Sequence, residues 1–294
     1  MIDKYYNGVI EQVAGGIGNV EHNSILVRYS NDFSIWDLES VNHYKDQTDI
    51  FFTCHEFSYN KIAEAYEPYL GLIRQMFHKY CSGTLEEFME ECDVYKLQRP
   101  VFESYFEKGF CERTEQILID EVEYEQERMH SSIVTMLQKL SEICPIVIVL
   151  NRFQLASKST MQLTNRLLQT KNKNIGIVLG VNDVQSIPEF AHEEWDAICE
   201  SMDDRNMVYH IGNAGRNMEP DVMDYYSDYE SDDGYRKLNN LVYFLDFDQA
   251  DHHLSKIERR IKFDNFTISE KKHYQLLLLQ IMVSVLQRDI AKAL

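Results

Sequence analysis

Two short apolar segments joined by one helix-length stretch constrain the fold more than any other feature of the chain. Residues 146–150 read Ile-Val-Ile-Val-Leu directly after Pro145, and residues 174–181 read Asn-Ile-Gly-Ile-Val-Leu-Gly-Val. Continuous apolar runs of this length are typical of strands that are buried on both faces of a parallel sheet. Residues 158–170 predict a helix, so the three segments together predict a right-handed βαβ unit.

The alternation of strands and helices continues over most of the chain. Further strands are expected at residues 8–14, 49–54 and 207–211, and further helices at 59–80, 84–92, 100–109, 115–143 and 190–201. Strands separated by helices indicate an α/β fold with a parallel sheet between layers of helices. We therefore expect a three-layer α/β domain over residues 1–215.

Residues 216–235 have a different composition. Seven acids and no base lie between Arg216 and Arg236, namely Glu219, Asp221, Asp224, Asp228, Glu230, Asp232 and Asp233. A run of like charges favours a solvated linker. The tyrosines within it leave a docking role for a partner open.

Residues 236–294 predict a helical end. Ala250, Leu254, Ile257 and Ile261 follow helical spacing, and Thr267-Ile-Ser-Glu270 has the pattern of a capping box before a long apolar helix at 271–294. The pair is similar to the hairpins of tetratricopeptide-like repeats. We expect the stripe to pack on Leu277 and Ile281. One hairpin cannot bury this much apolar surface, so we expect a protein partner or self-association there.

The charge and the cysteines exclude several classes of function. The net charge is −19 and no basic stripe is visible, so binding to nucleic acid or to an anionic membrane is not expected. The six cysteines show no C-x-x-C spacing, which argues against a zinc or redox motif. The chain has no signal-peptide pattern and no apolar run of the ~20 residues that a bilayer requires. We expect a cytoplasmic protein.

Two segments carry the candidate chemistry. Residues 13–20, Val-Ala-Gly-Gly-Ile-Gly-Asn-Val, contain the glycines 15, 16 and 18 and are expected to join a strand to a helix beginning near Asn19. Glycines in such a loop allow backbone N–H groups to cradle phosphate. The second segment begins at Asn151 and Arg152, directly after the strand 146–150. Asn182 follows the strand 174–181 in the same way.

Together these segments resemble the P-loop ATPases of the STAND and AAA+ type over about residues 8–212. The resemblance extends to Thr53-Cys-His-Glu-Phe57 and to Ala65-Tyr-Glu-Pro-Tyr-Leu70. In that family, two acids that serve Mg²⁺ and water follow the second strand, and here Asn151 and Arg152 take their places. The phosphate-loop lysine is replaced by Asn19, and Asn182 occupies the position that senses the γ-phosphate.

The resemblance implies a regulatory and protein-interaction module of a larger bacterial-type signalling protein that does not hydrolyse nucleotide. The output of such proteins is a DNA-binding domain or a cyclase such as a diguanylate cyclase. No cofactor is expected, although ATP or ADP would be the ligands of a retained site. Two alternatives stay open, namely an active ATPase that uses unorthodox residues and an interaction scaffold that binds no nucleotide.

Other catalytic patterns are missing from the sequence. The ten histidines form no H-E-x-x-H, because Trp195 follows His192-Glu193-Glu194, and no G-x-S-x-G is present. No metal site is therefore expected.

Overall fold

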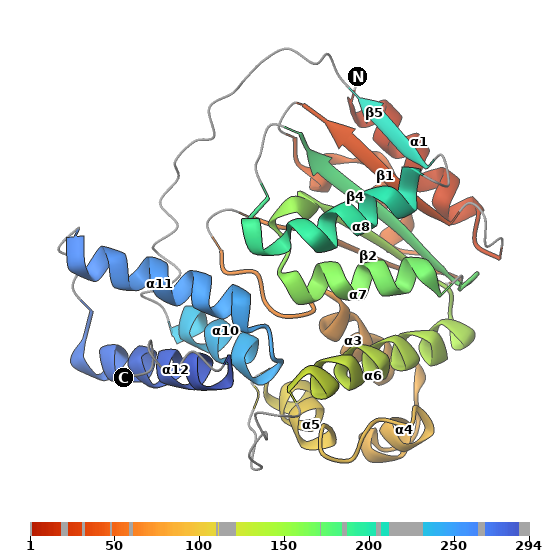
Figure 1. The fold of residues 1–294 in the computed structure, drawn as a ribbon. Coiled ribbons are helices and arrows are strands. Elements are labelled where there is room, and N and C mark those ends of the chain that lie inside the picture. The colour runs from red at the N-terminus through yellow and green to blue at the C-terminus, as the bar shows by residue number, and fades with distance from the viewer. Residues whose placement is uncertain are drawn as a thin grey trace.

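The chain folds around a five-stranded, all-parallel sheet (Figure 1). The computed structural model describes residues 2–18, 23–30, 33–47, 49–58, 61–109, 111, 122–170, 172–183, 187–203, 207–211, 232–263 and 268–287. The strand order is β2-β3-β4-β1-β5, with the strands at Ser24–Tyr29 (β1), Phe51–Glu56 (β2), Ile146–Asn151 (β3), Ile175–Asn182 (β4) and Val208–Ile211 (β5). The predicted α/β fold class is confirmed.

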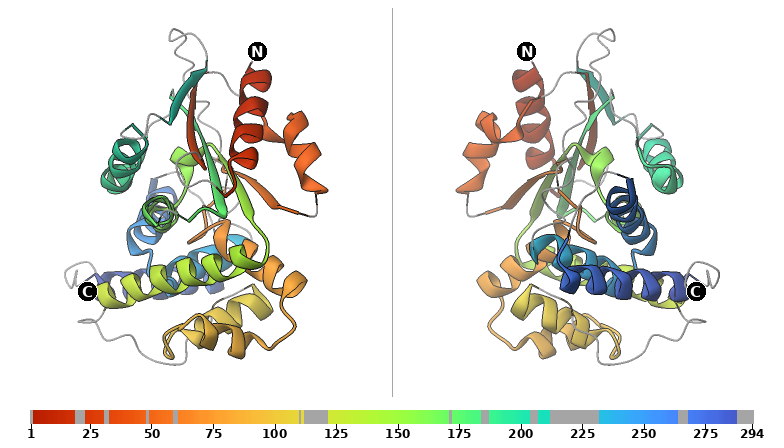
Figure 2. Two further views of the ribbon diagram at one scale, coloured as in Figure 1. Left: turned by 90° about the vertical axis from the view of Figure 1, so that its right-hand side faces the viewer. Right: turned by 90° about the vertical axis from the view of Figure 1, so that its left-hand side faces the viewer.

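Helices cover both faces of the sheet (Figure 2). The helices α1 (Ile2–Gly15) and α2 (Glu39–Lys45) lie on one face, and α7 (Lys158–Gln169) and α8 (His192–Asp203) lie on the other. Every residue of β3 and β4 is buried as a result. This burial on both sides explains why their sequences are apolar throughout instead of alternating.

Helix α1 packs unusually close to β4 because that strand presents two glycines. A Cβ atom at Gly176 would lie 2.6 Å from Cγ1 of Val13, and one at Gly180 would lie 2.3 Å from the Tyr6 hydroxyl oxygen. Both distances are shorter than any normal contact between heavy atoms. The two glycines are therefore required by the approach of the helix, and not by a turn.

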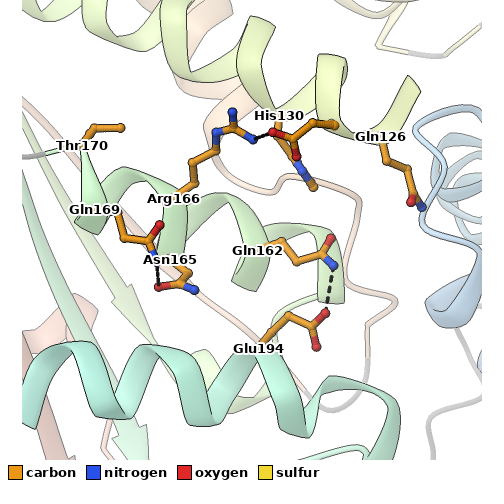
Figure 3. A pocket seen from close by; sticks show the side chains of 9 residues that line it. Gln126, His130, Gln162, Asn165, Arg166, Gln169, Thr170 and Glu194 are labelled. Atoms are coloured by element: carbon orange, nitrogen blue, oxygen red, sulfur yellow. Dashed lines mark hydrogen bonds and ion pairs between the residues drawn. The ribbon is translucent and has the colours of Figure 1, made fainter. Parts of the chain in front are cut away.

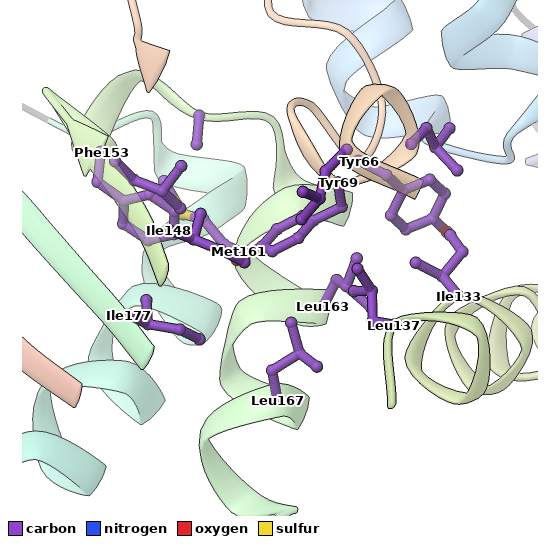
Figure 4. Packing of buried hydrophobic residues seen from close by; sticks show 14 of the residues in the cluster. Tyr66, Tyr69, Ile133, Leu137, Ile148, Phe153, Met161, Leu163, Leu167 and Ile177 are labelled. Atoms are coloured by element: carbon purple, nitrogen blue, oxygen red, sulfur yellow. The ribbon is translucent and has the colours of Figure 1, made fainter. Parts of the chain in front are cut away.

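Four further helices form a layer beside the sheet (Figure 1). They are α3 (Tyr69–Tyr80), α4 (Leu85–Glu91), α5 (Arg99–Lys108) and α6 (Val122–Ile143). Helix α7 lies between the sheet and α6, and its apolar side chains contact both (Figure 4). One continuous core therefore links the sheet to this helical layer, through Ile148, Met161, Leu163, Leu137 and Ile133.

The C-terminal helices α10 (Asp232–Tyr243), α11 (Phe247–Phe263) and α12 (Glu270–Leu286) pack against one another. Asp246 joins them to the sheet domain. Its carboxylate accepts hydrogen bonds from the backbone N–H of Gln249 in α11, at 3.4 Å, and of Ser159 in α7, at 2.9 Å. One fully buried carboxylate thus caps two helices, and burial raises its pKa.

Several sequence-based expectations for individual elements were wrong. Residues 8–14 belong to helix α1, because Tyr6, Val9, Ile10 and Val13 are buried at helical spacing. The strand β1 was missed, since its apolar run of three residues is short.

Other element boundaries in the structure differ from those expected from the sequence. The helix expected from residue 59 begins at Tyr69, after Pro68. The long apolar helix is capped by Ser269, whose hydroxyl accepts from the N–H of Lys272, two residues later than the capping box predicted. Within the acidic stretch, residues 232–235 begin α10, and its earlier residues lie outside the described part of the chain.

Candidate functional site

The carboxyl ends of four strands meet at one edge of the sheet and bring polar side chains together there. Strands β1, β2, β3 and β4 end at Tyr29, Glu56, Asn151 and Asn182. The chain leaves β1 towards α2 on one face and leaves β4 towards α8 on the opposite face. Adjacent strands whose connections diverge in this way form the topological switch point at which open parallel sheets bind ligands.

Asn151 lies at the centre of this edge and is fully buried. Its Oδ1 accepts a hydrogen bond from the Tyr29 hydroxyl at 2.7 Å. Among the described residues, neither the Asn151 Nδ2 nor the Tyr6 hydroxyl has a hydrogen-bond partner. Burial raises the pKa of Tyr6 well above its ordinary value, so this phenol stays protonated. Phe33 packs edge-on against Tyr6 and Tyr29, with ring centroids 5.2 and 4.8 Å away.

Arg152 follows Asn151 in the left-handed region, with φ of 54°. Its guanidinium lies 3.3 Å from Oε1 of Glu56 at the end of β2. The other oxygen of Glu56 accepts from the Ser34 hydroxyl and the Ile35 N–H, both at 3.2 Å. The charge of Arg152 is thus balanced inside the protein, and Glu56 fastens the segment after β1 to the edge.

Asn182 joins the same edge through its backbone. Its N–H donates to Oε1 of Gln154 at 3.3 Å, and Gln154 is itself fully buried just after β3. The three predicted site residues at strand ends, Asn151, Arg152 and Asn182, are therefore neighbours at one edge. Tyr6, Tyr29 and Glu56 belong to the same cluster and were missed, since they come from elements far apart in sequence.

The glycine segment lies at the opposite edge of the sheet. Gly15 ends α1, the Gly16 N–H donates to the carbonyl of Gln12, and the Gly18 N–H donates to that of Lys173, which precedes β4. A six-residue strand separates the two edges by about 20 Å. Gly15, Gly16 and Gly18 are thus remote from Asn151, and Asn19 lies outside the described residues.

The expected strand–loop–helix order at residues 13–20 was wrong. A phosphate loop leads from a strand into the N-terminus of a helix, whose free N–H groups point at the anion. Here the chain leaves the C-terminus of α1, where carbonyl groups are exposed, and enters β1. The first unit along the chain with the required order is β1 followed by α2. Residues 30–38 between them, Ser-Asn-Asp-Phe-Ser-Ile-Trp-Asp-Leu, contain no glycine and no lysine.

Helix α12 carries a second candidate surface. Its buried side is formed by Leu279 and Val283, while six exposed apolar residues follow helical spacing on the other side, namely Tyr274, Leu277, Leu278, Ile281, Met282 and Val285. We call these six the α12 stripe. Leu277 and Ile281 were expected to pack against α11, and that expectation was wrong, because they are 39% and 46% exposed.

Within the described ranges, no three His, Cys, Asp or Glu side chains are placed to hold a metal ion. No helix in that part of the chain has the length and apolar character needed to cross a bilayer.

Comparison of the chain with protein-family models, with curated proteins and with solved structures gave no match.

Proposed function

We propose that this protein is a non-catalytic regulatory module that works by protein interaction. On this proposal the parallel sheet is that of a STAND-like signalling ATPase whose catalytic groups have been replaced. The observation that carries the proposal is the polar network at the carboxyl edge. Arg152 pairs with Glu56, and Oδ1 of Asn151 accepts from Tyr29, so the cation and this oxygen at the edge are already engaged inside the protein.

The chemistry of phosphoryl transfer supports the same conclusion. That reaction depends on cations and Mg²⁺ that neutralise the charge of the transferring group. At the ends of β3 and β4, Asn151 and Asn182 are neutral amides and offer no carboxylate to Mg²⁺. The segment between β1 and α2 has neither the lysine nor the glycines of a phosphate loop.

A steady-state phosphate-release assay with Mg²⁺ and ATP tests the non-catalytic part of the proposal. We expect no turnover above the rate without protein, and the same background for an Asn151→Ala variant. Turnover by the wild-type protein that disappears in Asn151→Ala would show that the active-ATPase alternative is correct.

The interaction part of the proposal rests on the α12 stripe. A helix that is apolar on all sides is normally covered on all sides. We propose that two copies of the chain pair through antiparallel α12 helices. In that arrangement Lys271 and Lys272, in the first turn, lie beside the negative C-terminal end of the partner helix. Because each copy carries a net charge of −19, added salt is expected to strengthen the association.

Sedimentation velocity over a wide range of protein concentration tests this pairing. The wild-type chain is expected to associate, and a Leu278→Glu, Ile281→Glu variant is expected to remain monomeric. Tyr5→Glu is a matched control, since Tyr5 is an apolar residue exposed on α1. A wild-type protein that stays monomeric at every concentration and salt level would rule out the pairing.

A further inference from the structure

A polar groove runs along the exposed side of helix α7, between α6 and α8 (Figure 3). Its volume is about 640 Å³. The nine residues that line it come from three helices and from the C-cap of α7, and all have polar side chains: Gln126, Glu127, His130, Gln162, Asn165, Arg166, Gln169, Thr170 and Glu194. The groove is remote from the residues at the carboxyl edge of the sheet, none of which lines it.

Carboxamides form the floor of the groove. Gln162, Asn165 and Gln169 lie on one side of α7 at intervals of three and four residues, so they succeed each other along the helix. Gln162 donates to Oε1 of Glu194 at 2.8 Å, and Gln169 donates to Oδ1 of Asn165 at 3.4 Å. These bonds leave the side-chain oxygens of Gln162 and Gln169 as acceptors and the NH₂ group of Asn165 as a donor, and a peptide unit presents the matching N–H and C=O groups. The separation from Gln162 to Gln169 is about 10 Å, which matches about three residues of extended chain.

Two buried polar atoms in the lining have no hydrogen-bond partner within the described part of the chain. They are Nε2 of His130 and Oε2 of Glu194. His130 is only 8% exposed, and its ring is held edge-on against Tyr66. A buried polar atom without a partner costs free energy, so both atoms favour a ligand that supplies a donor or an acceptor.

The lining excludes other classes of ligand. An apolar molecule would find no apolar side chain, and a sugar would find no Trp, Tyr or Phe ring to stack on. A phosphate would meet one arginine, Arg166, which already pairs with Glu127 and donates to the Ser131 hydroxyl at 2.9 Å. Glu194 is likewise paired, with Lys158 at 3.6 Å, so the described lining offers a phosphate no unpaired cation.

We propose that this groove binds an extended peptide segment of another protein, through hydrogen bonds between the α7 carboxamides and the peptide main chain. This site is separate from the α12 stripe and from the carboxyl edge of the sheet, so it does not depend on the function proposed above.

Selection from random heptapeptides displayed on phage tests this proposal. The wild-type chain is the bait, and a Gln162→Met, Asn165→Leu variant is the counter-bait. Gln12→Met is the control, because Gln12 is a glutamine exposed on α1, on the other face of the sheet. We expect peptides enriched on the wild type and on the control but not on the double variant.

Calorimetry with the enriched peptides then measures main-chain recognition. The double variant is expected to bind at least about tenfold more weakly, since two neutral hydrogen bonds contribute on the order of 1 kcal/mol each. A copy of the peptide with N-methylated main-chain amides should lose affinity to a similar degree. In the wild type, the side-chain NH₂ signals of Asn165 and Gln169 should shift in NMR spectra when peptide is added, which checks the site without a variant.

Three results would overturn the proposal. One is selection without enrichment on the wild type. Another is equal affinity for the wild type and a double variant that keeps the wild-type melting temperature. The third is unchanged binding of the N-methylated peptide, which would show that the main chain is not recognised.

Discussion

At the scale of single residues, Gly180 sets the geometry of the candidate site. A Cβ at this position would lie 2.3 Å from the Tyr6 hydroxyl and 2.6 Å from Oδ1 of Asn151. Because Gly180 has no side chain, Tyr6 and Asn151 can both approach the backbone of β4 at this position. The two residues belong to a helix and a strand that are far apart in the sequence.

Gly180→Ala is expected to destabilise the protein by about 1–3 kcal/mol, the usual cost of overpacking a buried site. Gly8→Ala is the matched control, because a Cβ there meets nothing within 4 Å and alanine is the better helix former by about 1 kcal/mol. Chemical denaturation of the three proteins measures both changes. Equal stability of Gly180→Ala and wild type would show that α1 can shift away from β4 at no cost.

Some residues of the site could be predicted from the sequence and others could not, for a physical reason. Asn151, Arg152 and Asn182 directly follow long apolar runs, and the ends of neighbouring parallel strands meet at one edge. Tyr6 and Glu56 carry no such local signal, since their position depends on which strands become neighbours. The glycines at 176 and 180 were a usable clue, because residues four apart in a strand share a face and glycine allows close approach.

At the scale of elements, the two longest apolar strands and the helix between them were predicted well. The strands at 146–150 and 174–181 and the helix at 158–170 agree with β3, β4 and α7 to within a residue or two. Helix α12 shows where this reasoning fails. Its apolar residues occur on all sides, so the sequence gives no periodic stripe that identifies the packed side.

Val283 and Leu277 provide a direct test of which side of α12 is packed. Val283 has no exposed surface, so Val283→Asp would bury an unpaired carboxylate and is expected to cost about 3 kcal/mol or more. Leu277→Asp on the exposed side should cost less than about 1 kcal/mol in the monomer. Thermal unfolding at low protein concentration measures both, and the reverse order of the two effects would show that α12 is rotated.

At the scale of the whole molecule, two buried histidines make the fold sensitive to acid. Burial lowers the pKa of His130 to about 4 and that of His253 to about 3. Both lie below the unfolded value of about 6.5, so the unfolded chain binds protons more readily than the folded one. The stability that these neutral rings contribute is fully present above pH 6.5 and is lost as the pH falls towards the folded pKa values.

The free energy of unfolding should therefore fall between pH 6.5 and pH 5, by up to about 1.4 kcal/mol per pH unit for each histidine. His253→Gln removes one of the two groups that take up a proton on unfolding, so the unfolding free energy is expected to fall less steeply with pH. Urea denaturation across this range gives the slopes, and an unchanged slope for His253→Gln would contradict the assignment.

The double cap formed by Asp246 couples the position of α7 to that of α11. Because one buried carboxylate accepts from the first turns of both α7 and α11, moving one helix alone would break or strain one of these hydrogen bonds. Lys158 reinforces the joint, with its ammonium 2.7 Å from Asp248. The C-terminal helices are therefore coupled to the sheet domain at the start of α7. We expect a displacement of α12, when a partner binds there, to reach α7 and to change the positions of its carboxamides Gln162, Asn165 and Gln169.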